Sequence, residues 1–99
     1  MIQMSISNNP LFITFEGIDG CGKSTQVKML MDRFEKESIE SLLVREPGGT
    51  QISEEIRDVL LKNRYDKMSE RTEALLMTAS RSQLTKDVII PNLKSGKIV

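Results

Sequence analysis

Residues 11–25 read LFITFEGIDGCGKST, and this stretch decides the fold. Its first part, residues 11–15, is a short apolar and β-branched run of the kind that forms a buried strand in a parallel sheet. Its second part, residues 17–24, fits the pattern G-x-x-x-x-G-K-[ST] at every fixed position. Glycines let backbone N–H groups curl around phosphate oxygens, and a following helix offers the same anion its positive end. We therefore predict a phosphate-binding loop between a strand and a helix.

The side chains of this loop suggest ATP and Mg²⁺ as ligands. Lys23 would reach the outer phosphates, and Ser24 would ligate the metal. Cys21 occupies a variable position, where we expect a small filler and keep a redox role as the alternative. The predicted nucleotide-binding residues are Gly17, Ile18, Asp19, Gly20, Cys21, Gly22, Lys23, Ser24 and Thr25.

A helix and a second strand are predicted after the loop. Apolar residues recur at the i, i+3, i+4 and i+7 spacing of one helix face, namely Val27, Leu30, Met31 and Phe34. A second apolar run at residues 42–44 ends in the turn sequence of residues 46–49. The order strand, helix, strand predicts a βαβ unit.

Two or more helices are predicted over residues 51–94. One apolar stripe consists of Ile52, Ile56, Val59 and Leu60. Ser69 resembles an N-cap that is followed by the acidic residues Glu70 and Glu73, which a helix dipole favours. Pro91 removes one intrahelical hydrogen bond, so it either interrupts or kinks the last helix.

These elements predict an α/β fold of the P-loop nucleoside triphosphate hydrolase type, with three layers and a parallel sheet. Gly96 is expected to stop the last helix, and residues 97–99 begin a third apolar run. The sequence is thus expected to be truncated after the start of the third strand. Residues 1–10 contain no Lys or Arg and no long apolar run, so we expect a flexible leader rather than a signal peptide or membrane anchor. Residues 11–99 would form part of one domain.

The composition excludes several classes of function. The chain has 14 basic and 14 acidic residues, so its net charge favours neither a nucleic-acid partner nor a membrane surface. It has one cysteine and no histidine, which excludes a disulfide framework, the usual zinc sites and histidine acid–base chemistry. A reducing cytoplasm is the expected location.

A phosphate loop alone does not separate ATPases, GTPases and kinases. Residues 63–66 read NRYD and resemble a guanine-reading Asn-Lys-x-Asp element, but no Asp-x-x-Gly switch follows the phosphate loop. We interpret residues 63–66 as a connection between helices and keep a base-reading role as the alternative.

Further segments resemble the thymidylate kinase family in order and spacing. They are residues 15–20 (FEGIDG), 45–50 (REPGGT), 54–57 (EEIR), 72–76 (TEALL) and 79–81 (ASR). The resemblance covers residues 11–99, and the REPGGT segment is its most specific part.

This resemblance implies transfer of the γ-phosphoryl group of ATP to dTMP, which gives dTDP, with Mg²⁺ and in a cytoplasmic homodimer. It implies that Lys23 and Arg57 are catalytic and that Ser24 is the metal ligand. The implied substrate-binding residues are Asp19, Glu46, Arg57, Met77 and Arg81. Arg57 would grip the dTMP phosphate, Arg81 would hydrogen-bond the thymine, and Met77 would pack on the base. Met77 departs from the family, which usually has an aromatic residue there.

In the family, the third strand runs on into an Asp-Arg-aromatic motif, and an arginine-bearing lid and an adenine loop come later, but Val99 stops short of all of these positions. We therefore expect these 99 residues to be an incomplete copy, weakly active or inactive alone. Arg57 and Arg81 could instead be solvated helix arginines, and residues 46–49 only a turn. A kinase for another nucleoside monophosphate and a non-catalytic nucleotide-binding fragment remain open.

Overall fold

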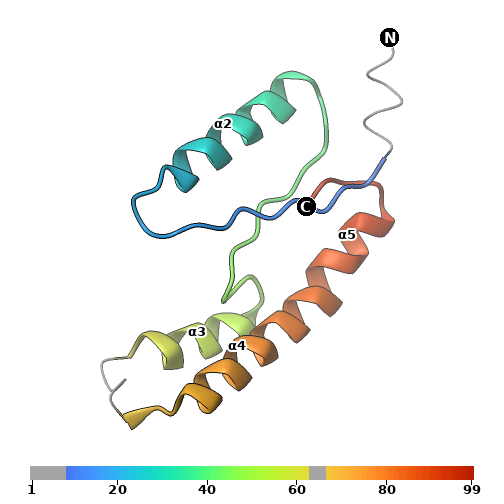
Figure 1. Ribbon diagram of the computed structural model, residues 1–99. Coiled ribbons are helices and arrows are strands. Elements are labelled where there is room, and N and C mark those ends of the chain that lie inside the picture. The colour runs from blue at the N-terminus through green and yellow to red at the C-terminus, as the bar shows by residue number, and fades with distance from the viewer. Residues whose placement is uncertain (1–8, 63–66) are drawn as a thin grey trace. The chain divides into compact units, whose positions relative to one another are not determined.

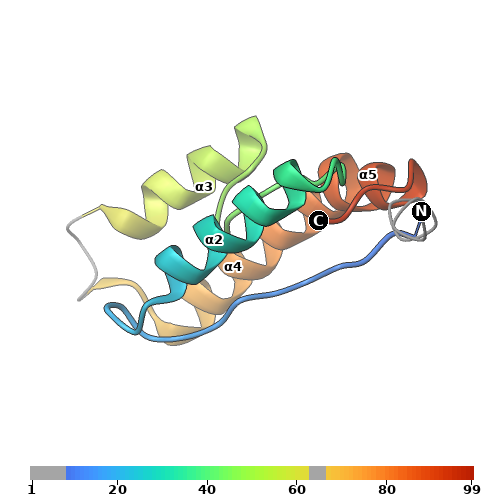
Figure 2. The same ribbon diagram turned by 90° about the horizontal axis from the view of Figure 1, so that it is seen from above.

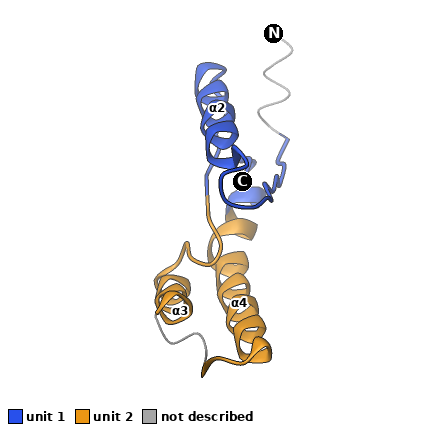
Figure 3. Ribbon diagram, turned by 60° about the vertical axis from the view of Figure 1, so that its left-hand side comes forward, with its two compact units in different colours: residues 1–43, 92–99 blue, residues 44–91 orange. Residues whose placement is uncertain are grey.

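The computed structural model describes residues 9–62 and 67–99, and its described backbone is mostly helical. The elements are helix α2 (Lys23–Lys36), helix α3 (Gln51–Leu61), helix α4 (Glu70–Leu84), the π-helical turn η2 (Thr85–Ile89) and helix α5 (Ile90–Lys94) (Figure 1). The chain divides into two compact units, residues 1–43 with 92–99 and residues 44–91 (Figure 3). The predicted connection at residues 63–66 and most of the predicted leader lie outside the described residues.

Helix α2 of the first unit follows the phosphate loop as predicted. Its half-buried apolar side chains are the four of the predicted stripe, Val27, Leu30, Met31 and Phe34. Gly22 is its N-cap, and the helix ends where the Glu37 N–H donates to the Arg33 and Glu35 carbonyls. The chain runs out to this loop and returns as α2 in both views (Figures 1 and 2). The predicted loop-to-helix junction is therefore confirmed.

Three non-helical segments of the first unit are joined through the last two residues. The Val99 N–H donates to the Leu11 carbonyl (2.9 Å), and the Ile13 N–H donates to the Val99 carbonyl (2.8 Å). On the other side, Ile98 forms a parallel bridge with Ser41. Residues 98–99 thus lie between residues 11–13 and 40–42, although the described residues form no strand longer than a bridge.

The expectation of a buried strand at residues 11–15 is not met. Leu11 and Phe12 are each 53% exposed. Parallel strands become buried when helices cover both faces of a sheet. The described part of this unit supplies only α2 and the end of α5 for that purpose, so these side chains remain uncovered.

The second unit is built from α3 and α4, which lie side by side (Figures 1 and 2). Each helix has a hydroxyl N-cap, since Thr50 accepts from the Ser53 N–H and Ser69 accepts from the Thr72 N–H. The predicted Ser69 cap is confirmed. Among the residues of this unit that the structure describes, the buried apolar ones are Leu60, Leu84 and Ile89.

Two fully buried serines connect these helices. The Ser53 hydroxyl on α3 donates to the Ser80 carbonyl on α4 at 2.9 Å. Both residues have 0% exposure, and each buried hydroxyl has a partner, as burial of a polar group requires. These hydrogen bonds at Ser80 fix the rotation of α4 about its axis and so the direction in which the next residue, Arg81, leaves the helix.

The helical backbone continues through Pro91, but the turn before this proline is π-helical and therefore wider than an α-helical turn. The turn η2 is π-helical, and the Ile90 N–H donates to the Thr85 carbonyl five residues earlier. A proline ring in an α-helix would clash with the carbonyl four residues before it, and a wider turn relieves that clash. The predicted helix stop is confirmed, because α5 ends at Lys94 and Gly96 has a φ of 89°.

We expect Gly49→Ala to destabilise the protein by about 2–3 kcal/mol, which urea unfolding would measure. Gly49 has a φ of +94°, and an added Cβ would lie 2.5 Å from Leu84 Cδ1. Gly20→Ala is the matched control, because Gly20 has a φ of +80° and no heavy atom within 4 Å of an added Cβ. Its cost is expected to be about 1–2 kcal/mol, from backbone strain alone. Equal costs for both variants would contradict close packing of Gly49 on Leu84.

Candidate functional site

The phosphate loop has the backbone that its sequence predicts. Gly20 and Gly22 have φ angles of 80° and 91°, which side chains on L-residues disfavour. The Cys21 N–H donates to the Ile18 carbonyl (3.3 Å), so the loop forms a turn over these residues. The Lys23 ammonium donates to the Gly17 carbonyl (3.1 Å) and thereby reaches back across the loop.

This geometry fits a nucleotide phosphate. No side chain caps the N-terminus of α2, and its first turn contains no acidic residue, so its N–H groups can bond an anion. Ser24 is the second residue of this helix and is exposed. Mg²⁺ usually binds through one or two protein oxygens, waters and the substrate phosphates, and this single hydroxyl fits that role. In residues 9–62 and 67–99 no cluster of three acidic or cysteine residues could hold a metal by itself.

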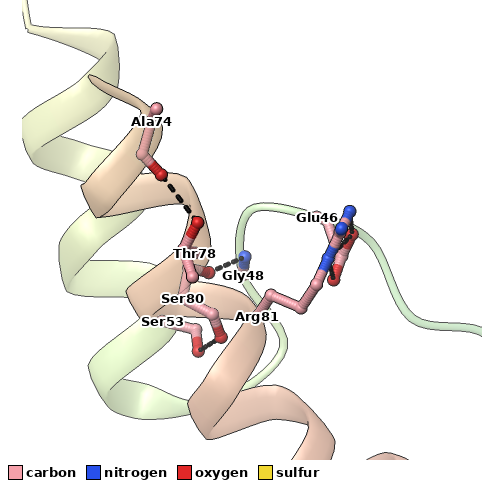
Figure 4. Close-up of polar contacts among 7 residues, drawn as sticks. All are labelled: Glu46, Gly48, Ser53, Ala74, Thr78, Ser80 and Arg81. Atoms are coloured by element: carbon pink, nitrogen blue, oxygen red, sulfur yellow. Dashed lines mark hydrogen bonds and ion pairs between the residues drawn. The ribbon is translucent and has the colours of Figure 1, made fainter. Parts of the chain in front are cut away.

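The second loop, residues 45–50, is held against both helices of its unit. The Gly48 N–H donates to the Ser80 hydroxyl of α4 (3.1 Å), and the Gly49 N–H donates to Glu54 Oε2 of α3 (2.7 Å). Figure 4 shows the loop lying against α4 at Ser80. We call this segment the 45–50 loop. It is an anchored loop with a fixed backbone rather than a plain connection.

Glu46 and Arg81 meet in a two-point ion pair. Arg81 Nη2 donates to Glu46 Oε2 at 2.6 Å, and Arg81 Nε lies 2.9 Å from Oε1 (Figure 4). A planar guanidinium held at two points by a carboxylate has a defined orientation. The side chains are 35 residues apart in sequence and come from the loop and from α4.

Arg57 binds the same loop from α3. Its Nη1 donates to the Pro47 carbonyl at 3.0 Å, and the side chain is part-buried. The second unit therefore brings together three predicted acceptor residues, Glu46, Arg57 and Arg81. Met77 lies one turn before Arg81 on α4 and is 37% exposed. Asp19 lies in the phosphate loop, which belongs to the first unit.

The supporting residues Arg45, Ser53, Glu54 and Ser80 were not predicted as parts of the site. Arg45 Nη2 bonds Glu54 Oε1 at 2.8 Å, so both oxygens of this carboxylate are used. A hydroxyl at Thr50 followed by an acidic residue in the first turn is a local signal for a capped helix. That signal identifies the start of α3, but it does not reveal the contacts that the Glu54 carboxylate makes with the 45–50 loop.

The Glu54 carboxyl has a lowered pKa. The chief cause is the hydrogen bond from the Gly49 N–H, followed by the hydrogen bond from Arg45, and both favour the ionised form. Partial burial acts in the opposite direction but is outweighed. Glu54 is therefore ionised in the folded protein at a pH where it would already bind protons in the unfolded chain.

We expect the stabilising effect of Glu54 to fade in acid. A carboxyl with a lowered folded-state pKa contributes stability above its unfolded pKa, and this contribution is lost as the pH falls through the folded value. Wild type should thus have a larger free energy of unfolding than Glu54→Gln at pH 7. The difference between the two should shrink as the pH falls below 4.5, which is the ordinary pKa of a glutamate carboxyl. Urea unfolding from pH 7 to pH 3 measures this, with the exposed neighbour Glu55→Gln as control. A difference that stays constant over this range would contradict the ionised contacts of Glu54.

No helix in the described part of the chain is both long enough and apolar enough to cross a membrane.

Comparison with known proteins finds one family in both the family-model match and the relatives of similar sequence. The family model for thymidylate kinase matches residues 15–99. The thymidylate kinase of Kosmotoga olearia is 54% identical over 89 residues, which are 90% of this chain and 42% of that protein. The thymidylate kinase of Fervidobacterium nodosum is 53% identical over 90% of this chain and 44% of its own length. This chain thus spans about two fifths of the length of these relatives.

A solved structure is also similar. The crystal structure of thymidylate kinase from Ehrlichia chaffeensis superposes with a TM-score of 0.82 at 38% identity, over 92% of this chain and 51% of that chain. This likeness supports the predicted P-loop kinase fold, although the described residues show only an isolated parallel bridge in place of a sheet. Because the family model covers most of its length, the chain belongs to the thymidylate kinase family.

Proposed function

We propose that the protein containing this chain transfers the γ-phosphoryl group of ATP to dTMP and so forms dTDP. The observation that carries the proposal is the phosphate loop at the start of α2, with Lys23 reaching across it, in a chain whose relatives are named thymidylate kinases. The loop indicates the phosphate donor, and the family indicates the acceptor.

The donor side of this proposal rests on residues 17–25. The N–H groups around Gly20 and Gly22 would bind phosphate oxygens, and Lys23 would neutralise charge on the outer phosphates. Ser24 would be the protein ligand of Mg²⁺. When bound, this ion neutralises charge that develops on the transferred group. In phosphoryl transfer the protein acts mainly by positioning and charge stabilisation, which are the roles these residues can fill.

The acceptor side rests on the 45–50 loop with its two helices. Arg57 would bind the dTMP phosphate by charge-assisted hydrogen bonds, in addition to holding the Pro47 carbonyl. Arg81 would hydrogen-bond the thymine in the orientation that Glu46 gives it. Met77 would lie against the base through its polarisable thioether. Asp19 would approach the sugar hydroxyl or the phosphate of dTMP.

The remaining expectations form part of the same proposal. The bonds on both sides of residues 98–99 support a parallel sheet in which that segment lies between the other two. We propose that residues 11–99 are the N-terminal part of one kinase domain, and that the protein is a cytoplasmic homodimer.

A panel of acceptors tests the proposal. The full-length gene product would be given ATP, Mg²⁺ and one of dTMP, dUMP, CMP or AMP, and kcat/KM would be compared. The proposal predicts the highest value for dTMP. Preference for another nucleotide would favour the alternative kinase, and nucleotide binding without turnover would favour a non-catalytic protein.

A further inference from the structure

The carboxylate of Glu54 joins the two ends of the 45–50 loop. One oxygen accepts from Arg45 at 2.8 Å, and the other accepts from the Gly49 N–H at 2.7 Å. The same carboxylate lies against Gly48, because a Cβ added to that glycine would overlap Glu54 Oε2. A single side chain of α3 thus holds the residues on either side of Glu46 and Pro47.

The residues enclosed by this bridge make the contacts on which dTMP binding is proposed to depend. Glu46 holds the Arg81 guanidinium, and the Pro47 carbonyl holds Arg57. A loop that is closed at both ends has fewer conformations, so its middle residues lose less freedom when a ligand binds. Hydrogen bonds to a carboxylate from a guanidinium and from a backbone N–H are among the stronger ones in proteins.

We propose that Glu54 is a positioning residue for the acceptor nucleotide: it fixes the 45–50 loop so that Glu46, Arg57 and Arg81 face dTMP in a binding-ready arrangement. This inference rests on the proposed function. Glu54 acts through Arg45 and Gly49 and does not itself need to touch the substrate. The lowered pKa of this carboxyl is consistent with the role, since the contacts that lower the pKa are those that hold the loop.

Kinetics of three variants of the full-length protein test the inference. Glu54→Ala is expected to raise the KM for dTMP about tenfold and to leave the KM for ATP unchanged. Glu54→Gln is expected to give an intermediate KM for dTMP, because its amide oxygen can still accept from the Gly49 N–H but cannot form an ion pair with Arg45. Glu55→Ala removes the same charge from the neighbouring exposed position on α3 and should leave both KM values at the wild-type level.

Hydrogen exchange at the Gly49 amide provides a readout that does not depend on substrate. Exchange should be faster in Glu54→Ala than in wild type and Glu55→Ala, because the Gly49 N–H loses its acceptor. If Glu54→Ala does not fold, Glu54→Gln carries the test through the KM for dTMP, because its amide oxygen still accepts from the Gly49 N–H.

The outcomes separate this inference from the proposed function. An active wild type whose KM for dTMP is unchanged in both Glu54 variants would overturn the inference alone. A parallel rise of the KM values for dTMP and ATP would also overturn it, because that pattern indicates general loss of structure. A wild type that does not phosphorylate dTMP would overturn the proposed function and this role with it.

Discussion

Replacing Lys23 by alanine is expected to lower kcat for dTMP phosphorylation about 10³-fold. Lys23 follows the loop glycines directly, and its ammonium reaches across the loop to the Gly17 carbonyl. A bound triphosphate would offer this ammonium its outer oxygens, where negative charge develops during transfer. Steady-state rates of dTDP formation with the full-length protein measure the effect.

Lys28→Ala provides the matched control for this prediction. Lys28 lies on the same helix, is 80% exposed and pairs only weakly with Asp32 at 3.8 Å. Its replacement removes the same charge from α2 but should leave kcat at the wild-type level. If the two alanine variants were equally active, Lys23 would have no part in catalysis.

The second large effect is expected for Arg57→Ala, with a loss of about 10²-fold in kcat/KM for dTMP. Arg57 contacts the Pro47 carbonyl from α3 and is part-buried, so its guanidinium is held beside the loop that carries Glu46. Loss of this cation would leave the acceptor phosphate without its proposed charge-assisted partner. Initial rates at varied dTMP and saturating ATP measure the change.

Two further variants complete this prediction, one that separates charge from geometry and one matched control. Arg57→Lys keeps the charge but loses the planar fork, so we expect it to recover only part of the activity. Arg71→Ala removes an exposed arginine from α4 and should have little effect. If Arg57→Ala has the activity of Arg71→Ala, then Arg57 only holds the Pro47 carbonyl and does not bind the dTMP phosphate.

Local patterns predicted the helices and the phosphate loop well. The stripe that begins at Val27 lies on the half-buried face of α2, and Ser69 caps α4 as expected. These features depend on spacings of a few residues, which the sequence displays directly. The glycines of the loop and Gly96 were likewise predictable, because a positive φ favours one residue type.

Contacts between distant residues were harder to predict. Gly48 bonds Ser80 across 32 positions, and Ser53 bonds Ser80 across 27. The helical spacing of apolar residues does not specify which serine of α4 contacts the 45–50 loop. The sequence therefore predicted Glu46 and Arg81 as members of one site, but neither their ion pair nor the supporting role of Glu54.

Burial and helix pitch also departed from expectation, for physical reasons. Phe12 has the sequence context of a buried strand, but it is exposed. Burial of a strand depends on the helices that pack against it, and residues 11–15 alone do not specify those helices. Pro91 predicted a disturbed helix, but the disturbance lies one turn earlier, in the π-helical residues Thr85–Ile89. A wider turn accommodates a proline ring without ending the helix.

Transfer of labelled phosphate tests the central claim most directly. The full-length gene product would be incubated with dTMP, Mg²⁺ and ATP labelled at the γ-phosphoryl group, and the products would be separated. The account predicts labelled dTDP in an amount equal to the ADP formed. Release of the label as inorganic phosphate with dTMP unchanged, or ATP binding without any transfer, would contradict it.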